Sequence, residues 1–122
     1  MKKHILLVED EEFVAKAYDK HFRVQGYSVD IAKNTLTAKK LIHKHIPDII
    51  LLDIILPGEN GLRLLERLKG DIKTKTIPVI VISNLSNPHE IEWCKKMGVL
   101  EYMVKTDFSV QQVINKVSTY IQ

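Results

Sequence analysis

The stretch DIILLDIILPGENG, residues 48–61, places the carboxylate of Asp53 between two aliphatic runs. The residues just before it, 49–52, are all isoleucine or leucine, so both faces of this segment are apolar. A short run that is apolar on both faces is typical of a central strand in a parallel sheet. The PGENG that follows is typical of a loop. We therefore predict a buried strand over 48–53 that ends at an acid.

Four other short segments resemble strands. Each is too short for a helix, is rich in aliphatic residues and is bounded by polar or turn-forming residues. One of them alternates between apolar and polar residues, which indicates a half-buried strand. The four segments are HILLVE (4–9), the alternating YSVDIA (27–32), IPVIVIS (77–83) and LEYMV (100–104).

Apolar residues with helical spacing lie between the strands. In 12–25, Val14, Tyr18 and Phe22 recur at i, i+4 and i+8, and Gly26 ends the stripe. Helix-start residues mark three of the other four helices: Asn34, Asn87 followed by a proline, and Ser109 with a glutamine three residues later. The inward-facing residues expected in these four helices are Ala38, Leu41, Ile42 and His45 in the second, which Pro47 ends; Leu64, Leu65 and Leu68 in the third; Ile91 and Cys94 in the fourth, which Gly98 ends; and Val110, Val113, Ile114, Val117 and Ile121 in the last.

Five strand–helix units in alternation predict an α/β fold. The expected architecture is a doubly wound, five-stranded parallel sheet with five helices on its two faces and right-handed crossovers. The length of 122 residues suits one domain, 1–122. In such folds the site lies beyond the carboxyl ends of the strands.

The composition argues against several other classes. The net charge of +3, from 18 basic and 15 acidic side chains, is too weak and too dispersed to predict direct binding to nucleic acid. No apolar run is long enough to span a membrane, and acids interrupt the first one too early for a signal peptide. The single cysteine, Cys94, cannot form an internal disulfide, so we expect a reducing, cytoplasmic location. If an effector domain exists, it lies outside these residues.

The predicted strands end in chemically active side chains. The first ends at Glu9 and Asp10, the third at Asp53, the fourth at Ser83, and the fifth runs into Lys105. Three carboxylates about 5 Å apart would repel one another by roughly 3 kcal/mol per pair at an effective dielectric near 20. The lysine offsets one charge, and a divalent ion with oxygen ligands, such as Mg²⁺, would offset two more.

Each of these residues also has a purely structural interpretation. The first two acids could cap a helix, Asp53 could form a turn, Ser83 could be a loop residue and Lys105 a solvated charge. Their combination favours a site, because all of them fall at the same edge of the predicted sheet. The five histidines show no metal-binding spacing and are expected at the surface; they are His4, His21, His43, His45 and His89.

The motifs ILLVEDE, DIILLDIILPGENGL, IPVIVIS and EYMVK, taken in order, closely resemble the receiver domain of bacterial two-component response regulators. The resemblance covers essentially the whole chain. It implies the flavodoxin-like strand order 2-1-3-4-5. It also implies a phosphorelay switch that assists its own phosphorylation and dephosphorylation but is not otherwise an enzyme.

The resemblance assigns a role to each acid. Asp53 would accept a phosphoryl group from the phosphohistidine of a sensor histidine kinase or phosphotransfer protein. Asp10, Asp53 and the main-chain carbonyl of Ile55 would ligate Mg²⁺ directly, and Glu9 would do so through water. Such a transfer needs an in-line nucleophile and well-spread positive charge more than covalent help.

The resemblance also identifies switch residues. Lys105 would pair with the phosphoryl oxygens, Ser83 would bond the phosphoryl group, and Tyr102 would change rotamer with it. An aromatic residue on a strand is also common as simple packing. The chain departs from the family after the lysine, where Thr106 replaces the usual proline. A cis peptide bond before a residue other than proline costs about 3–4 kcal/mol. The geometry of the peptide bond at 105–106 therefore stays open. The chain also departs after Ser83, where Asn84 and Leu85 stand and a small residue is common.

Three other functions are compatible with parts of this pattern. A Mg²⁺-dependent phosphohydrolase with an aspartyl-phosphate intermediate is the main alternative, but Ile55 stands where some such enzymes carry their acid/base. A flavin carrier would need a hydroxyl-rich phosphate loop after the first strand, where this chain has the acidic VEDEEF. A degenerate receiver would bind partners without phosphorylation, although every acidic position is filled.

A partner surface is expected on the fourth helix, fifth strand and fifth helix, for an effector or for a homodimer. The single tryptophan, Trp93, lies on the fourth helix. Because Ile91 and Cys94 are expected to face inward, we predict that Trp93 is at least half exposed and lies at such an interface. No membrane contact is expected.

Overall fold

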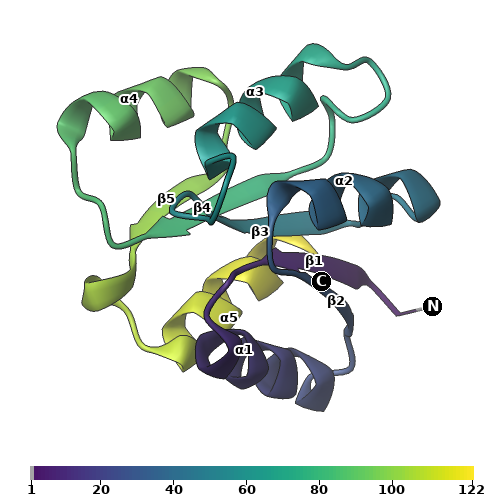
Figure 1. Ribbon diagram of the computed structural model, residues 1–122. Coiled ribbons are helices and arrows are strands. Elements are labelled where there is room, and N and C mark those ends of the chain that lie inside the picture. The colour runs from purple at the N-terminus through teal and green to yellow at the C-terminus, as the bar shows by residue number, and fades with distance from the viewer. Residues whose placement is uncertain (1) are drawn as a thin grey trace.

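The computed structural model describes residues 2–122, which form a five-stranded parallel sheet covered by helices on both faces (Figure 1). The strand order is β2-β1-β3-β4-β5, and every neighbouring pair is parallel, as predicted. Predicted strand 77–83 begins two residues late, because Pro78 has no amide hydrogen for the ladder. The strands are β1 (His4–Val8), β2 (Ser28–Ala32), β3 (Ile49–Asp53), β4 (Val79–Ser83) and β5 (Glu101–Val104).

All five predicted helices are present. The predicted starts are confirmed: the side chain of Asn34 accepts from Thr37 N at 2.8 Å, and that of Asn87 accepts from His89 N at 2.8 Å. The capping box formed by Ser109 with the glutamine three residues later is also confirmed. None of the helices in 2–122 is long and apolar enough to cross a membrane. The helices are α1 (Glu12–Val24), α2 (Thr35–Lys44), α3 (Gly61–Gly70), α4 (Pro88–Lys96), α5 (Val110–Tyr120) and the short 3-10 turn η1 (Lys105–Asp107).

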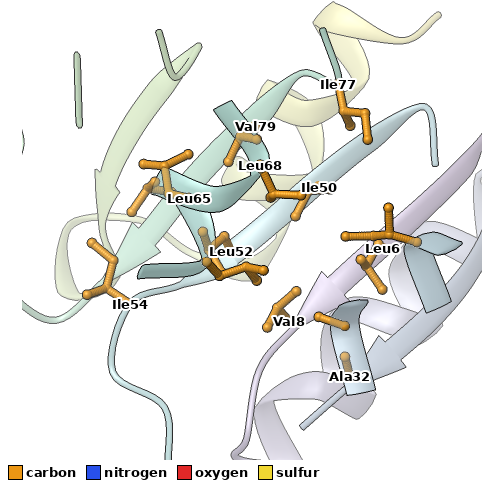
Figure 2. Close-up of a cluster of buried hydrophobic side chains, with 14 of the residues drawn as sticks. Leu6, Val8, Ala32, Ile50, Leu52, Ile54, Leu65, Leu68, Ile77 and Val79 are labelled. Atoms are coloured by element: carbon orange, nitrogen blue, oxygen red, sulfur yellow. The ribbon is translucent and has the colours of Figure 1, made fainter. Parts of the chain in front are cut away.

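The sheet separates two hydrophobic cores. Helices α2, α3 and α4 cover one face, and α1 and α5 cover the other (Figure 1). Side chains of β1 alternate between them: Leu6 and Val8 enter the first core, shown in Figure 2, and Ile5 and Leu7 enter the second. Burying one such side chain contributes about 1.5–3 kcal/mol. The central strands are therefore held rigidly from both sides.

Two predictions about histidines are wrong, namely that His4 lies at the surface and that His45 faces inward, whereas the expectation that His45 lies at the surface is confirmed. His4 is buried, with 8% of its surface exposed, because parallel pairing in register with Ser28 brings its ring against β2. Its Nδ1 lies 2.7 Å from Ser28 Oγ, and its Nε2 lies 3.0 Å from Asp30 Oδ2. His45 was expected to face inward but is exposed, because α2 ends at Lys44 and the chain becomes extended there. Its ring stacks on His4 at a centroid distance of 4.5 Å.

The prediction that Trp93 is at least half exposed is also wrong. Its side chain is partly buried and packs against the first core. Met97, one helical turn further along, packs against the same core. The large indole therefore folds down beside Cys94, which is fully buried as expected. The apolar stripe of α4 is wider than the sequence pattern indicated.

Candidate functional site

Four adjacent strands deliver the candidate residues to one edge of the sheet. Glu9 follows the last residue of β1, Asp53 is the last residue of β3, and Ser83 is the last residue of β4. Lys105 follows β5 directly and begins η1. Because β1, β3, β4 and β5 are consecutive in the sheet, their carboxyl ends meet at one place.

The centre of the site is a lysine held between two carboxylates. Lys105 Nζ lies 2.7 Å from Glu9 Oε1 and 2.8 Å from Asp53 Oδ2. The second oxygen of each acid is also bonded: Glu9 Oε2 accepts from Glu11 N at 3.2 Å, and Asp53 Oδ1 accepts from Ile55 N at 3.1 Å. Both carboxylates are therefore fixed in orientation. The contact between Lys105 and Glu9 was not predicted, since their separation in the sequence gives no local signal.

Burial and hydrogen bonding act in opposite directions on the pKa values of Glu9 and Lys105. Only 1% of Glu9 and 3% of Asp53 is exposed. Burial raises the pKa of Glu9, and the hydrogen bond from Lys105 offsets this only in part. Burial alone would lower the pKa of Lys105, but the hydrogen bonds to Asp53 and Glu9 outweigh it and raise that pKa above its ordinary value. The lysine thus stays charged at neutral pH.

Three acids form a cluster at this centre, and one of them is exposed to solvent. Glu9, Asp10 and Asp53 each offer one carboxylate oxygen, and these atoms lie within 4.8 Å of one another. Asp10 is exposed, whereas the other two acids are buried. Three hard oxygen donors, one of them exposed to solvent, fit the coordination that Mg²⁺ prefers, since this ion usually keeps several waters.

The predicted switch residues, Ser83 and Tyr102, both form hydrogen bonds with the main chain of Leu85. Leu85 N donates to Ser83 Oγ at 3.1 Å, and Tyr102 OH donates to Leu85 O at 2.9 Å. Ser83 is fully buried, and burial raises the pKa of the Tyr102 phenol. The residue after Ser83, Asn84, is exposed. Tyr102 is therefore tied to the loop after β4 by a specific bond, beyond packing.

The loops at the site have two further features. The peptide bonds described in 2–122 are all trans, and Thr106 lies within η1. Gly61 N donates to Ile54 O at 2.7 Å, and a Cβ at Gly61 would lie 2.5 Å from Asp53 O. Only glycine fits where α3 begins against the end of β3. This requirement was not predicted from the sequence, although the glycine itself stands within the opening stretch.

A parallel sheet of this order, with a buried aspartate and a lysine at its carboxyl edge, is the arrangement of response regulator receiver domains. Residues 5–118 match the family model described as the response regulator receiver domain. The chain belongs to this family. Receiver domains are signalling switches of two-component systems, and they typically bind Mg²⁺ at an acidic pocket such as the one formed by Glu9, Asp10 and Asp53.

Among known proteins, the chain is similar to the polar-differentiation response regulator DivK of Brucella anthropi. The two are 32% identical over 121 residues, which cover 99% of this chain and 98% of that protein. The fold matches the non-phosphorylated HemR receiver domain from Leptospira biflexa with a TM-score of 0.90 and 26% identity, over 99% of this chain and 95% of that one. It also matches the signal receiver domain of a histidine kinase from Syntrophus aciditrophicus, with a TM-score of 0.86 and 26% identity, over 98% and 89% of the two chains.

Proposed function

We propose that this domain is a phosphorylation switch whose acceptor is Asp53. The donor is the phosphohistidine of a sensor histidine kinase or of a phosphotransfer protein. The observation that carries the proposal is the buried Asp53 carboxylate with Lys105 Nζ at 2.8 Å. A rigid strand holds the nucleophile there, and a fixed cation lies where negative charge must be accommodated.

In the transfer step, a carboxylate oxygen of Asp53 attacks the phosphorus atom and the phosphorus–nitrogen bond breaks. The electron pair of that bond returns to the donor imidazole, whose other nitrogen carries a proton, so that it leaves as neutral imidazole. Lys105 pairs with the phosphoryl oxygens, whose charge spreads in the transition state. Because the lysine already bridges Asp53 and Glu9, it needs only a small displacement to do so.

Mg²⁺ would be held by Asp10, Asp53 and the main-chain carbonyl of Ile55, with Glu9 binding through water. When bound, this ion supplies positive charge to the phosphoryl oxygens. The chain's own part is to orient these donors. The bond from Ile55 N to Asp53 Oδ1, at 3.1 Å, orients the acceptor and the loop that carries the carbonyl.

Ser83 and Tyr102 are the proposed readout. A phosphoryl group on Asp53 would accept a hydrogen bond from the Ser83 hydroxyl and draw it inward. Because Leu85 N donates to the same hydroxyl at 3.1 Å, the loop after β4 then moves with it. Tyr102 follows, because its hydroxyl is bonded to Leu85 O. Such a movement alters the surface formed by α4, β5 and α5, where we place an effector or a second copy of the chain. Trp93 contributes to that surface only through its exposed edge.

Mass analysis after incubation with acetyl phosphate and Mg²⁺ tests the proposal. We expect a gain of one phosphoryl group, located at position 53. Asp53→Asn should take up none, whereas Asp107→Asn, an exposed acid just beyond Lys105, should be labelled normally. Labelling of Asp53→Asn would overturn the assignment. Repeated turnover of a phosphate ester by the unaltered protein would favour the phosphohydrolase alternative.

A further inference from the structure

A groove lies between α2 and α3, away from the Asp53 site. It has a volume of about 470 Å³. Its floor is aliphatic, with Ile42, Leu64 and Leu68, and the half-exposed Ile46 forms one end. This volume is within the range of ligand-binding pockets. The groove also lies outside the α4, β5 and α5 surface proposed above for the readout.

The rim of the groove is predominantly basic. It carries Lys39, Arg67 and Lys73, together with His43 and a single acid, Asp71. The acid is engaged within its own turn, since Asp71 Oδ1 accepts from Lys73 N at 2.9 Å.

The basic character extends over the whole α2–α3 side. Residues 33–75 contain nine of the 18 lysines and arginines but only five of the 15 acids, which gives a formal net charge of +4. The rest of the chain, with nine basic and ten acidic residues, carries −1. Two of the five acids do not offset this charge on the α2–α3 surface, because Asp53 belongs to the phosphoacceptor site and Asp48 precedes β3 at the opposite end of the sheet.

Two cations of the rim, Lys39 and Arg67, already pair with a carboxylate that lies outside the groove lining. Glu59, from the loop before α3, lies with its carboxylate 3.4 Å from Lys39 Nζ and 3.2 Å from the Arg67 guanidinium. Thr35 Oγ1 also donates to it at 3.1 Å. The cations at this end of the groove are thus arranged to hold a carboxylate. At the other end, neither Lys73 nor His43 takes part in an ion pair with any other residue of 2–122.

We propose that this groove docks an acidic amphipathic helix of a partner protein. Aliphatic side chains of that helix would pack on Ile42, Leu68 and Ile46, and its carboxylates would pair with Lys73 and His43. A helix laid along the gap between two helices is an established mode of recognition, read by apolar anchors at i, i+4 and i+7. The charge of the rim selects acidic helices over basic ones. The proposal does not depend on phosphorylation of Asp53.

The test uses the unphosphorylated, isotope-labelled protein and a synthetic amphipathic helical peptide. The peptide carries leucine at i, i+4 and i+7 with glutamate on either side. Its addition should shift the backbone amide NMR signals of α2, α3 and residues 71–74. A matched peptide with lysine in place of glutamate should bind at least about tenfold more weakly, a difference of about 1.4 kcal/mol.

Two pairs of variants separate the groove from the rest of the surface. Lys73→Glu should weaken peptide binding by about tenfold. Lys95→Glu, which makes the same charge change on exposed α4, should leave binding unchanged. Ile46→Ser should weaken binding, whereas Ile72→Ser, which replaces an exposed isoleucine outside the groove lining, should not.

Several results would overturn the proposal. These are the absence of shifts, shifts centred on α4 and α5, equal binding of the lysine peptide, or equal effects within either pair of variants. If decanoate produced the same shifts and bound with higher affinity than the peptide, the groove would be assigned to a small anionic amphiphile. If the molecular mass in solution were twice that of the monomer without peptide, and Lys73→Glu restored the monomer, the groove would be assigned to a second copy of this chain.

Discussion

Lys105 is the residue on which the balance of charge at the site depends. Its side chain is mostly buried and is hydrogen-bonded to two carboxylates, which are themselves almost fully buried. Two acids and one lysine leave a net negative charge. Removing the lysine and removing one of the acids should therefore have opposite consequences for stability.

Lys105→Met should lower the free energy of unfolding at neutral pH by about 2–3 kcal/mol, because it leaves two buried carboxylates without a cation. Asp53→Asn should leave it unchanged or raise it by less than about 1 kcal/mol, since it removes one buried negative charge while Lys105 and Glu9 still pair. Urea denaturation of both single variants and of the double variant gives the coupling free energy between Asp53 and Lys105. We expect the methionine substitution to be less destabilising when Asp53 is already asparagine. The same loss in both backgrounds would contradict this account of the site.

We predict that Ile55 limits access of water to the phosphorylated acceptor. It is 50% exposed beside Asp53, and it can neither accept a proton nor hydrogen-bond a water. Ile55→Asn and Ile55→Glu should speed loss of the phosphoryl group from Asp53 by about tenfold, equivalent to about 1.4 kcal/mol of barrier. Decay of the purified phosphoprotein, followed by intact mass, measures this. Identical decay in all three proteins would mean that Ile55 only packs in its loop.

Among the elements, the loop from β3 to α3 couples the site most directly to the fold. Glu59 ties it to α2 and α3, and Gly61 places the start of α3 against the main chain of β3. The loop is thus held at both sides of the acceptor strand. A change that moves it should affect phosphorylation and stability together.

Gly61→Ala tests this coupling, because its Cβ would lie 2.5 Å from Asp53 O and 2.7 Å from Ile54 Cα. Neither main-chain atom can give way without moving the end of β3. We expect a loss of about 1–3 kcal/mol in unfolding free energy and slower labelling by acetyl phosphate. Gly70→Ala, at the other end of α3, meets nothing within 4 Å and should be neutral or stabilising by up to about 1 kcal/mol. Similar losses in the two variants would refute the steric argument.

The elements themselves could be predicted from the sequence because their signals are local. Asn34, Asn87 and Ser109 each satisfy an amide within three residues, and the aliphatic run before Asp53 needs only its own composition to be identified as a buried strand. His45 was expected to face inward because α2 was expected to continue through it. His4 and Trp93 were placed wrongly because their environments depend on neighbours from other elements. The Glu59 contacts and the bond between Lys105 and Glu9 escaped prediction for the same reason, since they join residues distant in sequence.

At the scale of the whole molecule, the parallel topology explains why the candidate site could be inferred. It carries the ends of four neighbouring strands to one edge, so residues separated by most of the chain meet there. The residue types could be identified in the sequence, and the strand order explains why these residues lie close together. The asymmetry of charge between the α2–α3 side and the rest of the molecule emerges only once the helices are in place.

Binding of Mg²⁺ to this edge should stabilise the whole fold. A ligand that binds only the native state at ten times its dissociation constant adds about 1.4 kcal/mol, which raises the thermal midpoint of a domain of this size by a few degrees. Asp10→Ala should abolish the rise, because it removes the exposed acid of the cluster. Glu66→Ala, a change at an exposed acid of α3, should retain it. Thermal denaturation with and without Mg²⁺ decides the matter, and the same rise in Asp10→Ala would argue against this cluster.

The two cores on opposite faces of the sheet have a mechanical consequence. Helix α4 rests on one core and α5 on the other, with the edge strand β5 between them. Because the sheet separates the two layers, we expect that a small displacement of either helix over its own layer would not force the opposite layer to repack. A partner that contacts both helices would therefore respond to the position of α4 relative to α5. It could distinguish two states of the domain that differ in this relative position but are nearly identical within either layer.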